Sequence, residues 1–469
     1  MTTAAVIGSG PNGLAAALTM AAAGVSVTVY EADEVPGGGT RSSELTLPGL
    51  LHDECSSHHP FGPASAFAQE FALENHGLEW AFTEVEFAHP LDSGRGAALV
   101  RSVFETAKGL GGDAKRYRQV MGPVASRMPT ISAEFLQSMI HVPKHPIHLA
   151  ILGMRAALPA AAIAAMFETE EATALWAGVA AHTFGSFAQP LSSAIGTSLA
   201  SAAHYYGWPV AVGGSGRIAT AVLSALRDHG GAIEVGRRID DVRELGSPDV
   251  LMFDTGPSET LRIAADLLPS HTQRILRRWQ PGPAAFKLAL AVDGGIPWEY
   301  EPATRAGTIH VSGSYKETAA AELATTKGAM PQRPYVLLGQ QYLADPSRAN
   351  GNLVPIDCYA HVPNGYSGDA TEAILSQIER FAPGFKERVM AMTPRGTADI
   401  ERLNPNFAGG DILTGNKDLL QLVLGPRSGL SAYRLGTKGI YQCSAATPPG
   451  PGAHGMCGYL AAKKALADL

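Results

Sequence analysis

The chain has 469 residues, 45% of them hydrophobic and 17% charged, which describes a globular protein with room for two domains. Its 36 basic and 43 acidic residues give a formal net charge of −7, so we expect no nucleic-acid partner. The four cysteines (Cys55, Cys358, Cys443 and Cys457) include no close pair at metal-binding or redox-disulfide spacing. We therefore expect a reducing compartment, no metal site and no disulfide-reductase chemistry.

An apolar run begins at residue 4, which leaves no space for a signal peptide, so we expect a cytoplasmic protein. The longest apolar stretch, residues 146–167, is interrupted by Arg155 and Pro159 and is too broken for a membrane span. Helical patterns rich in Ala, Leu, Met and Phe recur between residues 67 and 203, which is typical of a layer that covers a substrate. The alternative is an exposed apolar patch that makes peripheral contact with a membrane.

The strongest motif fills residues 4–31. An apolar strand (4–7) enters GSGPNG (8–13), an alanine-rich helix follows (14–23), and a β-branched strand (25–30) ends at Glu31. This is the order of a dinucleotide-binding βαβ unit, whose glycines allow a tight turn, a close approach to a pyrophosphate and close helix packing. Glu31 can accept hydrogen bonds from ribose hydroxyls. The expected cofactor-binding residues are Gly8, Gly10, Pro11, Asn12, Gly13 and Glu31.

A second glycine-rich segment, GGGTRS at residues 37–42, follows within one loop. Its glycines leave room for a long cofactor beyond the strand end, and Arg41 can reach a diphosphate. The combination of Glu31 with this segment resembles the FAD-binding signature of the amine oxidase and phytoene desaturase superfamily. An NAD-dependent dehydrogenase has no reason to carry it. The resemblance adds Gly38, Gly39, Thr40 and Arg41 to the expected FAD site.

Residues 207–235 contain a third glycine-rich pattern. Gly214, Gly216 and Ala219 match GxGxxA and are followed by a helix pattern and a strand, which would suit an NAD(P)H site. The entering strand is short and broken by Pro209, which argues against that interpretation. The resemblance implies instead that the segment returns the chain to the FAD domain. Strand residues 239–242, including Ile239, would then lie along the adenosine, and the run 250–253 would complete the return.

Alternating apolar and polar residues from Phe286 onward predict strands of a mixed or antiparallel sheet, which the resemblance assigns to the floor of the substrate domain. Near the C-terminus, a strand (439–444), a loop rich in glycine and proline (446–455) and a helix (456–466) follow one another. The N–H groups at such a helix start can hold an anion. The resemblance implies that this helix start faces flavin N1 and O2, which adds Gly455 and Met456 to the expected FAD site.

Together these motifs span nearly the whole chain and look like the phytoene desaturase-like branch of the FAD-dependent oxidoreductases, closer to its non-carotenoid members than to the carotenoid enzymes. The fold class that this implies is α/β, with a Rossmann-like FAD-binding domain and an inserted α+β substrate domain. We expect the FAD-binding domain to comprise residues 1–70, 204–272 and 430–469. The substrate (cap) domain would comprise residues 71–203 and 273–429.

An enzyme of this branch would take a hydride from a C–H bond of a lipid-, polyene- or terpenoid-like substrate, form a C=C bond and pass the electrons to a quinone or oxygen. The candidates for the proton acceptor are His58, His59, Asp53 and His454, and the sequence prefers none of them. In the resembling family the segment of His58 and His59 passes close to the flavin, although structural roles for both are equally open.

Two further functions stay open. One is an isomerase or hydratase that uses reduced FAD without net redox chemistry, and the other is a non-catalytic flavoprotein that acts as a partner or scaffold. Amine oxidation is not expected, because no aromatic pair flanks a lysine in the pattern that amine oxidases use.

Overall fold

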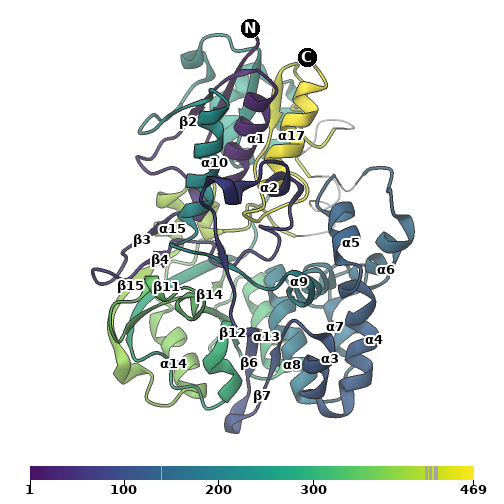
Figure 1. The fold of residues 1–469 in the computed structure, drawn as a ribbon, viewed down its shortest axis with the longest axis vertical. Helices are drawn as coiled ribbons and strands as arrows, with labels where there is room; N and C mark the ends of the chain where they lie inside the picture. Colours follow the sequence, from purple (N-terminus) through teal and green to yellow (C-terminus); the bar gives the residue numbers. More distant parts are fainter. Residues whose placement is uncertain (139, 418–420, 422–424, 427–430) are drawn as a thin grey trace.

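The computed structural model describes residues 1–138, 140–417, 421, 425–426 and 431–469, so the expected domain boundary at residues 429 and 430 lies outside the described residues. The chain forms a parallel sheet, a larger mixed sheet and a layer of helices (Figure 1). Both termini lie at the end of the molecule that contains the parallel sheet.

Five strands make up the parallel sheet, in the order β16-β10-β1-β2-β9. They are β1 (Thr3–Ile7), β2 (Ser26–Tyr30), β9 (Ala232–Glu234), β10 (Val250–Phe253) and β16 (Ile440–Gln442). Because the strands are parallel, their C-terminal ends meet at one edge, where Gly8, Glu31 and Asp254 directly follow three neighbouring strands.

Helices cover both faces of this sheet. Alternate residues of β1 face opposite sides, with Ala4 and Val6 in one core and Ala5 and Ile7 in the other. The first core is covered by α1 (Pro11–Ala22), α10 (Gly216–Asp228) and α17 (Met456–Leu466), and the second by α11 (Pro257–Ala264) and α12 (Ser270–Arg277). The first and last helices pack so closely that a Cβ on Gly458 would overlap the carbonyl oxygen of Asn12.

The mixed sheet has seven strands in the order β15-β11-β14-β13-β12-β6-β7. They are β6 (Val85–Pro90), β7 (Gly96–Leu99), β11 (Ala284–Asp293), β12 (Ala306–Val311), β13 (Val336–Gly339), β14 (Leu353–Val362) and β15 (Val389–Arg395). Only the pairing of β12 with β6 is parallel among the described strands of this sheet. Helix α14 (Thr371–Phe381) packs into the core on one face, through Ile374 and Phe381.

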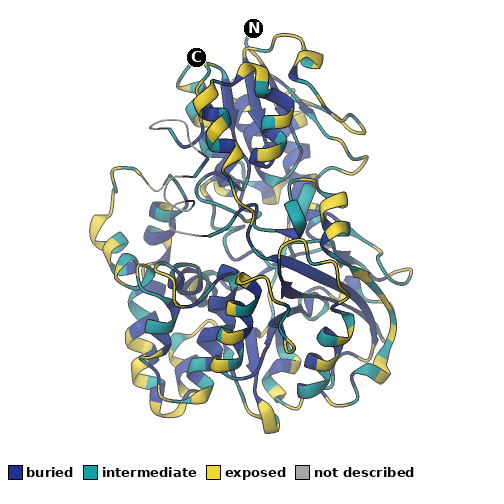
Figure 2. Cartoon of the chain, turned by 180° about the vertical axis from the view of Figure 1, so that it is seen from behind, coloured by how far each residue is buried: buried dark blue, intermediate teal, exposed yellow. Residues whose placement is uncertain are grey.

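A layer of helices packs on the mixed sheet at the end formed by β6 and β7. Its members are α3 (Val103–Lys108), α4 (Ala114–Ala125), α5 (Met128–Phe135), α6 (Pro146–Ala156), α7 (Ala160–Ala164), α8 (Glu170–Ala180) and α9 (Ser193–Tyr206). Figure 2 shows these helices exposed along their outer sides and buried toward the sheet. Within the ranges that the structure describes, no helix combines the length and the apolar composition needed to cross a bilayer.

The other described α-helices and strand pairs lie between these elements in the chain. They are α2 (Ala66–Glu70), α13 (Tyr315–Thr326), α15 (Thr397–Leu403) and the strand pairs β3 (Ser42–Ser43) with β4 (His52–Asp53) and β5 (Trp80–Ala81) with β8 (Val210–Ala211).

The α/β fold class with a Rossmann-like parallel sheet is confirmed. One expected element is wrong: residues 239–242 form no strand. Asp241 caps the 3-10 turn Val242–Leu245, in which Glu244 reciprocates the cap, so the local hydrogen bonds favour a turn.

Candidate functional site

A cavity of about 1120 Å³ begins at the C-terminal edge of the parallel sheet and runs toward the mixed sheet and the helical layer. The cavity wall combines segments that lie far apart in the sequence. Its main parts are residues 8–12, 30–34, 38–41, 55–62, 254–255, 402–407 and 444–454, one side of α6 and side chains from α9. Ligands of open α/β sheets bind at this edge of the sheet.

The glycine loop after β1 wraps around a buried carboxyl group, that of Asp254. Gly8 has a φ of +99°, and a Cβ on Gly10 would lie 2.5 Å from Asp254 Oδ2. The N–H of Gly13 donates to the same oxygen over 2.8 Å, and a Cβ on Gly13 would overlap the carbonyl oxygen of Gly8. Burial raises the pKa of Asp254 well above its usual range, and the nearby Glu31 carboxylate adds to this rise.

Asp254 was not among the site residues expected from the sequence, which assigned only the preceding run 250–253 to the return of the chain to the FAD domain. Gly13 contributes by packing against it and does not itself line the cavity, whereas Gly8, Gly10, Pro11 and Asn12 do. An acidic residue directly after β10, next to the glycine loop, was the available signal. To recognise Asp254 as a site residue, one has to know that β10 pairs with β1.

Glu31 lies on the cavity wall at the end of β2. Its Oε2 accepts the backbone N–H of Ser9 over 2.9 Å and also the Ser9 hydroxyl, while Oε1 accepts the N–H of Asp33 over 2.9 Å. A carboxylate offers about four acceptor positions, so capacity for a ribose hydroxyl remains. The side chain thus ties the glycine loop to β2 while it faces the cavity.

The second glycine segment meets the first. A Cβ on Gly38 would lie 3.0 Å from Gly10 Cα, and Gly39 and Thr40 also line the cavity. Arg41 lines the cavity as well, but its guanidinium pairs with Asp33 and donates to the carbonyl of Leu403 over 3.0 Å. Its buried Nε makes no hydrogen bond to the described residues but lies 4.0 Å from Glu54 Oε2, so Arg41 offers less to a diphosphate than the sequence suggested.

The C-terminal loop lines the cavity from residue 444 to His454. His454 Nδ1 accepts the N–H of Met456 over 3.1 Å, and burial lowers the pKa of His454 to about 4. His454 is therefore a neutral acceptor that takes one of the helix-start donors expected for a flavin. Gly455 and Met456 lie behind the wall, and a Cβ on Gly455 would lie 2.6 Å from Phe67. Ile239 lies on the wall, although in a turn rather than a strand.

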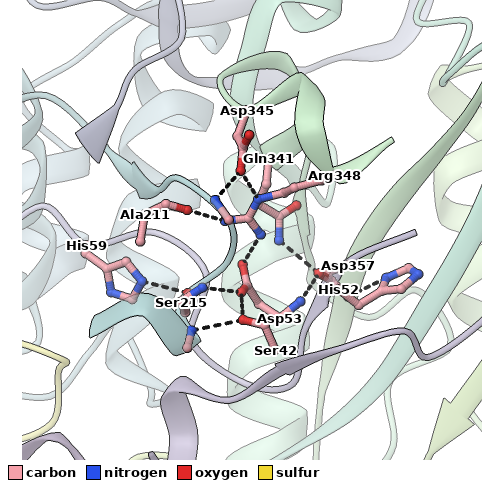
Figure 3. A network of polar contacts seen from close by, with 12 residues as sticks. Ser42, His52, Asp53, His59, Ala211, Ser215, Gln341, Asp345, Arg348 and Asp357 are labelled. Atoms are coloured by element: carbon pink, nitrogen blue, oxygen red, sulfur yellow. Dashed lines mark hydrogen bonds and ion pairs between the residues drawn. The ribbon is translucent and has the colours of Figure 1, made fainter. Parts of the chain in front are cut away.

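The third glycine-rich pattern binds the chain's own side chains. At the start of α10, the N–H of Ser215 donates to Asp53 Oδ1 over 2.8 Å and the N–H of Gly216 donates to Ser42 Oγ over 3.0 Å (Figure 3). The preceding strand β8 pairs antiparallel with β5 and is not part of the parallel sheet. The donors that an NAD(P)H phosphate would need are thus occupied, and the second βαβ crevice is absent from the described part of the chain.

Asp53 lies in a buried polar network and not on the cavity wall (Figure 3). Its Oδ2 pairs with Arg348 Nη1 over 2.6 Å, and Oδ1 accepts from Ser42 and Ser215. Because both carboxylate oxygens are occupied and buried, Asp53 is badly placed as a proton acceptor for a substrate. Asp357 extends the network by accepting the N–H of Asp53 over 2.9 Å.

His58 and His59 line the cavity just after this network. Burial lowers the pKa of His58 to about 3 and that of His59 to about 4, so both rings are neutral at neutral pH. His59 Nε2 lies 2.9 Å from Ser215 Oγ, which ties His59 to the start of α10. His58 Nε2 is buried without a partner among the described residues, so His58 has the freer ring.

His182 is a cavity-lining residue that the sequence analysis missed. It lies in the 3-10 turn Ala181–Thr183 after α8, with Trp208 and Tyr359 also on the wall. No motif marks it, because its position depends on how the helical layer packs on the mixed sheet. The cavity wall also includes Leu149, Leu152 and Ala156 of α6, which are apolar.

Comparison with known proteins agrees with this geometry. The family of NAD(P)-binding Rossmann-like domains matches residues 6–71. The chain is 24% identical to the rat "Pyridine nucleotide-disulfide oxidoreductase domain-containing protein 2", over 99% of this chain and 93% of that protein.

Two solved structures are similar over nearly their whole length. A putrescine oxidase in its putrescine-bound form has a TM-score of 0.63 at 15% identity, with 99% of each chain covered. Cyclohexylamine oxidase from Brevibacterium oxydans has a TM-score of 0.58 at 14% identity, covering 99% of this chain and 98% of that one. This chain shares the fold of these oxidases. At such identities the likeness concerns the fold alone, so the chemistry must be argued from the site.

The residues present fit the dinucleotide FAD. Two loops meet at the sheet edge through glycines that leave room for a cofactor, and the start of α1 lies behind them. The buried Nε of Arg41 beside them makes no hydrogen bond to the described residues. The cavity then continues well beyond the glycine loops into an apolar part, as a long cofactor and an adjoining substrate require.

Proposed function

We propose that the chain is an FAD-dependent oxidoreductase of the phytoene desaturase-like branch, which desaturates a C–C bond of a hydrophobic substrate. The observation that carries this proposal is the single cavity that joins the glycine loops at Gly10 and Gly38 to an apolar chamber at α6. The five parallel strands would belong to the FAD-binding domain (1–70, 204–272 and 430–469), and the seven-stranded sheet to the substrate domain (71–203 and 273–429).

The proposed cofactor contacts follow the cavity wall. Glu31 would accept the ribose hydroxyls, and the loops around Gly10 and Gly38 would approach the diphosphate. Ile239 would lie against the adenosine, and the loop that ends at His454 would lie near the ring system. Gly13, Gly455 and Met456 would support these loops from behind the wall.

When bound, FAD supplies the hydride acceptor for the oxidation. The protein's own part is to exclude water, orient the substrate and take up a proton. The apolar residues of α6 on the wall, Leu149 and Leu152, provide the dry surface. Neutral ring nitrogens at His58 and His59 are available as acceptors, whereas the carboxylate of Asp53 is occupied by Arg348. A quinone or oxygen would then take the electrons.

We further propose that the substrate enters from a membrane surface at α6. The side of this helix opposite the cavity and the loop before it expose Ile140, Val142, Ile147 and Met154, with Val142 90% exposed and Ile147 75% exposed. Lys144 is exposed among them and would meet anionic lipid headgroups. A single helix would thus present apolar residues to the bilayer on one side and to the cavity on the other.

Flotation with vesicles of phosphatidylcholine and phosphatidylserine tests this entry route. The double variant Val142→Asp with Ile147→Asp should reduce the bound fraction at least tenfold, because two apolar side chains no longer enter the lipid. Met390→Asp is the control, since Met390 is also exposed but lies on β15. Equal binding by all three proteins would contradict the membrane contact.

The absorbance spectrum of the purified full-length protein tests the cofactor. We expect flavin bands, and acid precipitation should release FAD into the supernatant because the site contains no attachment pattern for a covalent bond. Yellow colour that stays with the precipitate would contradict non-covalent binding. A colourless protein that does not take up added FAD would contradict the proposed function itself.

Anaerobic bleaching of the bound flavin tests the substrate class. The panel would contain lipids, terpenoids and polyenes, together with primary amines because two structural relatives are named as amine oxidases. Isomerisation or hydration of a panel compound that requires prior flavin reduction would favour the non-redox alternative. The scaffold alternative is weakened by the cavity, since such a protein would fill it with its own side chains.

A further inference from the structure

Three histidines form a row that leads from the half-buried His182 on the cavity wall to the buried His310 and His89. His182 lines the cavity, and its Nε2 lies 3.1 Å from Nε2 of His310 on β12. His310 is fully buried, and its ring centre lies 6.3 Å from that of His89 on β6, the strand that pairs with β12. None of the three carries a role in the proposed cofactor site.

At the end of the row that is farthest from the cavity, a hydrogen bond determines which nitrogen of His89 carries the proton. His89 Nε2 lies 2.6 Å from the carbonyl oxygen of Gly313, and a carbonyl oxygen can only accept. Burial lowers the pKa of His89 to about 4, so its ring is neutral at neutral pH and carries one proton. That proton is on Nε2, which leaves a lone pair on Nδ1.

His310 and His89 come together beside Gly178, a glycine of α8. A Cβ on Gly178 would lie 2.5 Å from His310 Nδ1 and 2.6 Å from His89 Nδ1, so the two nitrogens lie within about twice that distance of each other. Neither nitrogen has a hydrogen-bond partner among the described residues. The two nitrogens make no hydrogen bond to each other. Because His89 Nδ1 presents a lone pair, a proton on Nδ1 of His310 avoids the repulsion between two neighbouring lone pairs.

Gly178 is unexpected in this position. A glycine in the interior of a helix costs about 0.5–1 kcal/mol relative to alanine. Here an alanine would press its methyl group against both imidazoles, so the missing side chain provides the space in which the row is formed. The carbonyl of Gly178 also accepts from the Tyr335 hydroxyl over 2.9 Å, which holds Tyr335 beside His310.

The position of the proton on His310 then determines which nitrogen of His182, at the cavity end of the row, carries a proton. With its proton on Nδ1, His310 presents a lone pair on Nε2, and the 3.1 Å contact requires His182 to donate from its own Nε2. His182 therefore keeps a lone pair on Nδ1. This atom has no hydrogen-bond partner in the described part of the chain, and its residue lies on the cavity wall.

We propose that His182 Nδ1, rather than a ring nitrogen of His58 or His59, is the atom that accepts a proton from the substrate, and that His310 and His89 are positioning residues that keep its lone pair available. The proposal rests on the proposed oxidoreductase function. In the step, the bond to a proton next to the oxidised carbon breaks and an N–H bond forms at Nδ1, which turns the imidazole into an imidazolium. The electron pair of the broken bond forms the new double bond, while the hydride of the neighbouring C–H bond leaves to the flavin.

Other titratable groups face the row. His361 pairs with Glu322 through its Nδ1 over 2.7 Å, and His58 lies on the same cavity wall as His182. Burial, together with the nearby His361, lowers the pKa of His182 to about 3, whereas the hydrogen bond that its Nε2 keeps to His310 supports the charged ring. The row therefore favours prompt release of the proton after each reaction.

Histidine tautomers read by NMR test the positioning. The full-length, flavin-loaded protein would be labelled with ¹⁵N-histidine, and signals would be assigned by their loss in His182→Gln, His310→Gln and His89→Gln. We expect His182 and His89 to carry the proton on Nε2 and His310 to carry it on Nδ1. A His182 ring protonated on Nδ1 would overturn the proposal.

Two variants then test whether His89 controls the tautomer of His182. His89→Phe removes the ring that fixes His310, so His182 and His310 should each show a mixture of both tautomers. His204→Gln is the matched control, because His204 is buried in the helical layer against Tyr117 and lies off the cavity wall. An unchanged His182 tautomer in folded His89→Phe would remove the positioning role.

The acceptor role is tested with the panel compound that reduces the flavin fastest. His182→Ala should slow the reduction step on the order of a hundredfold, and added imidazole should restore part of the rate. Reduction at the wild-type rate would overturn the proposal. If no compound reduces the flavin, the proposed function fails, whereas the tautomer result stands by itself because it needs no turnover.

Discussion

Arg348 and Asp53 form an ion pair that is fully buried, with Nη1 and Oδ2 2.6 Å apart. Arg348 comes from the segment before β14, and Asp53 from the segment that leads to His58 and His59. The same guanidinium binds Asp345 and the carbonyl of Ala211 (Figure 3). One side chain therefore connects the cavity segment, the start of α10 and the mixed sheet.

We expect Arg348→Met to destabilise the protein by about 3–5 kcal/mol, because it leaves the buried carboxylates of Asp53 and Asp345 without their partner. The free energy of unfolding from denaturant titration measures this. The double variant with Asp53→Asn should recover part of the loss. Arg95→Met, which removes an exposed pair with Glu170, should have a much smaller effect, and equal losses would contradict the role of burial.

Replacement of Glu31 tests the ribose contact. Glu31→Ala should weaken FAD binding at least tenfold, since charge-assisted hydrogen bonds contribute about 1.5–3 kcal/mol each. Glu31→Gln should lose less, because the amide oxygen still accepts from Ser9. Titration of the apoprotein with FAD gives the dissociation constants, with the exposed Glu74→Ala as control. A dissociation constant unaffected by Glu31→Ala would show that the carboxylate serves the loop alone.

Asp254→Asn should change the pH dependence of stability. The raised pKa means that the folded protein holds a proton on Asp254 at pH values where the unfolded chain has released it. Wild-type stability therefore falls as pH rises from the ordinary value of 3.8 toward the raised pKa, by about 1.4 kcal/mol per pH unit from this group. The asparagine variant lacks this loss.

Thermal unfolding at a series of pH values checks this sign. The variant should gain on the wild type as pH rises from 4 to 8, and the two should converge at the acid end. An advantage that grows toward low pH would be the opposite sign and would mean that Asp254 is ionised in the folded protein.

NADPH should have no saturable site. The N–H donors at the start of α10 are bound by Asp53 and Ser42, so no phosphate can replace them without breaking the Arg348 network. Stopped-flow mixing should show flavin reduction that is slow and linear in NADPH concentration. Fast reduction that saturates at micromolar NADPH and is lost in Gly216→Val, with FAD retained, would contradict this.

Much of the fold was accessible from local sequence signals. The helix at residues 456–466 and the strand at 250–253 were predicted with the bounds observed, because their periodicity and flanking glycines are local features. The turn at residues 239–242 was missed because the strand expected there came from a resemblance. The capping box between Asp241 and Glu244 favours a turn instead. The mixed sheet was also predicted in kind, since its strands alternate clearly.

The site was harder to predict for a physical reason. The glycine loops are recognisable as local motifs. The residues that contact the site come from distant parts of the chain: Asp254 contacts Gly13, Asp53 contacts the start of α10 next to Gly216, and His310 contacts His182. Such contacts depend on how whole elements pack, and no spacing within one segment encodes them. The sequence analysis accordingly named Asp53 among four candidate proton acceptors, although it lies off the cavity wall, and did not name His182, which lies on it.

The close packing of α17 on α1, at Gly458 and Asn12, has a consequence for biosynthesis. The glycine loop is synthesised well before β10, β16 and the loop that ends at His454. The nascent chain therefore exposes an unfinished parallel sheet for most of its synthesis, which is a state prone to aggregation. Flavin supply therefore acts on a chain in which these later segments have joined the sheet, rather than on the isolated glycine loop.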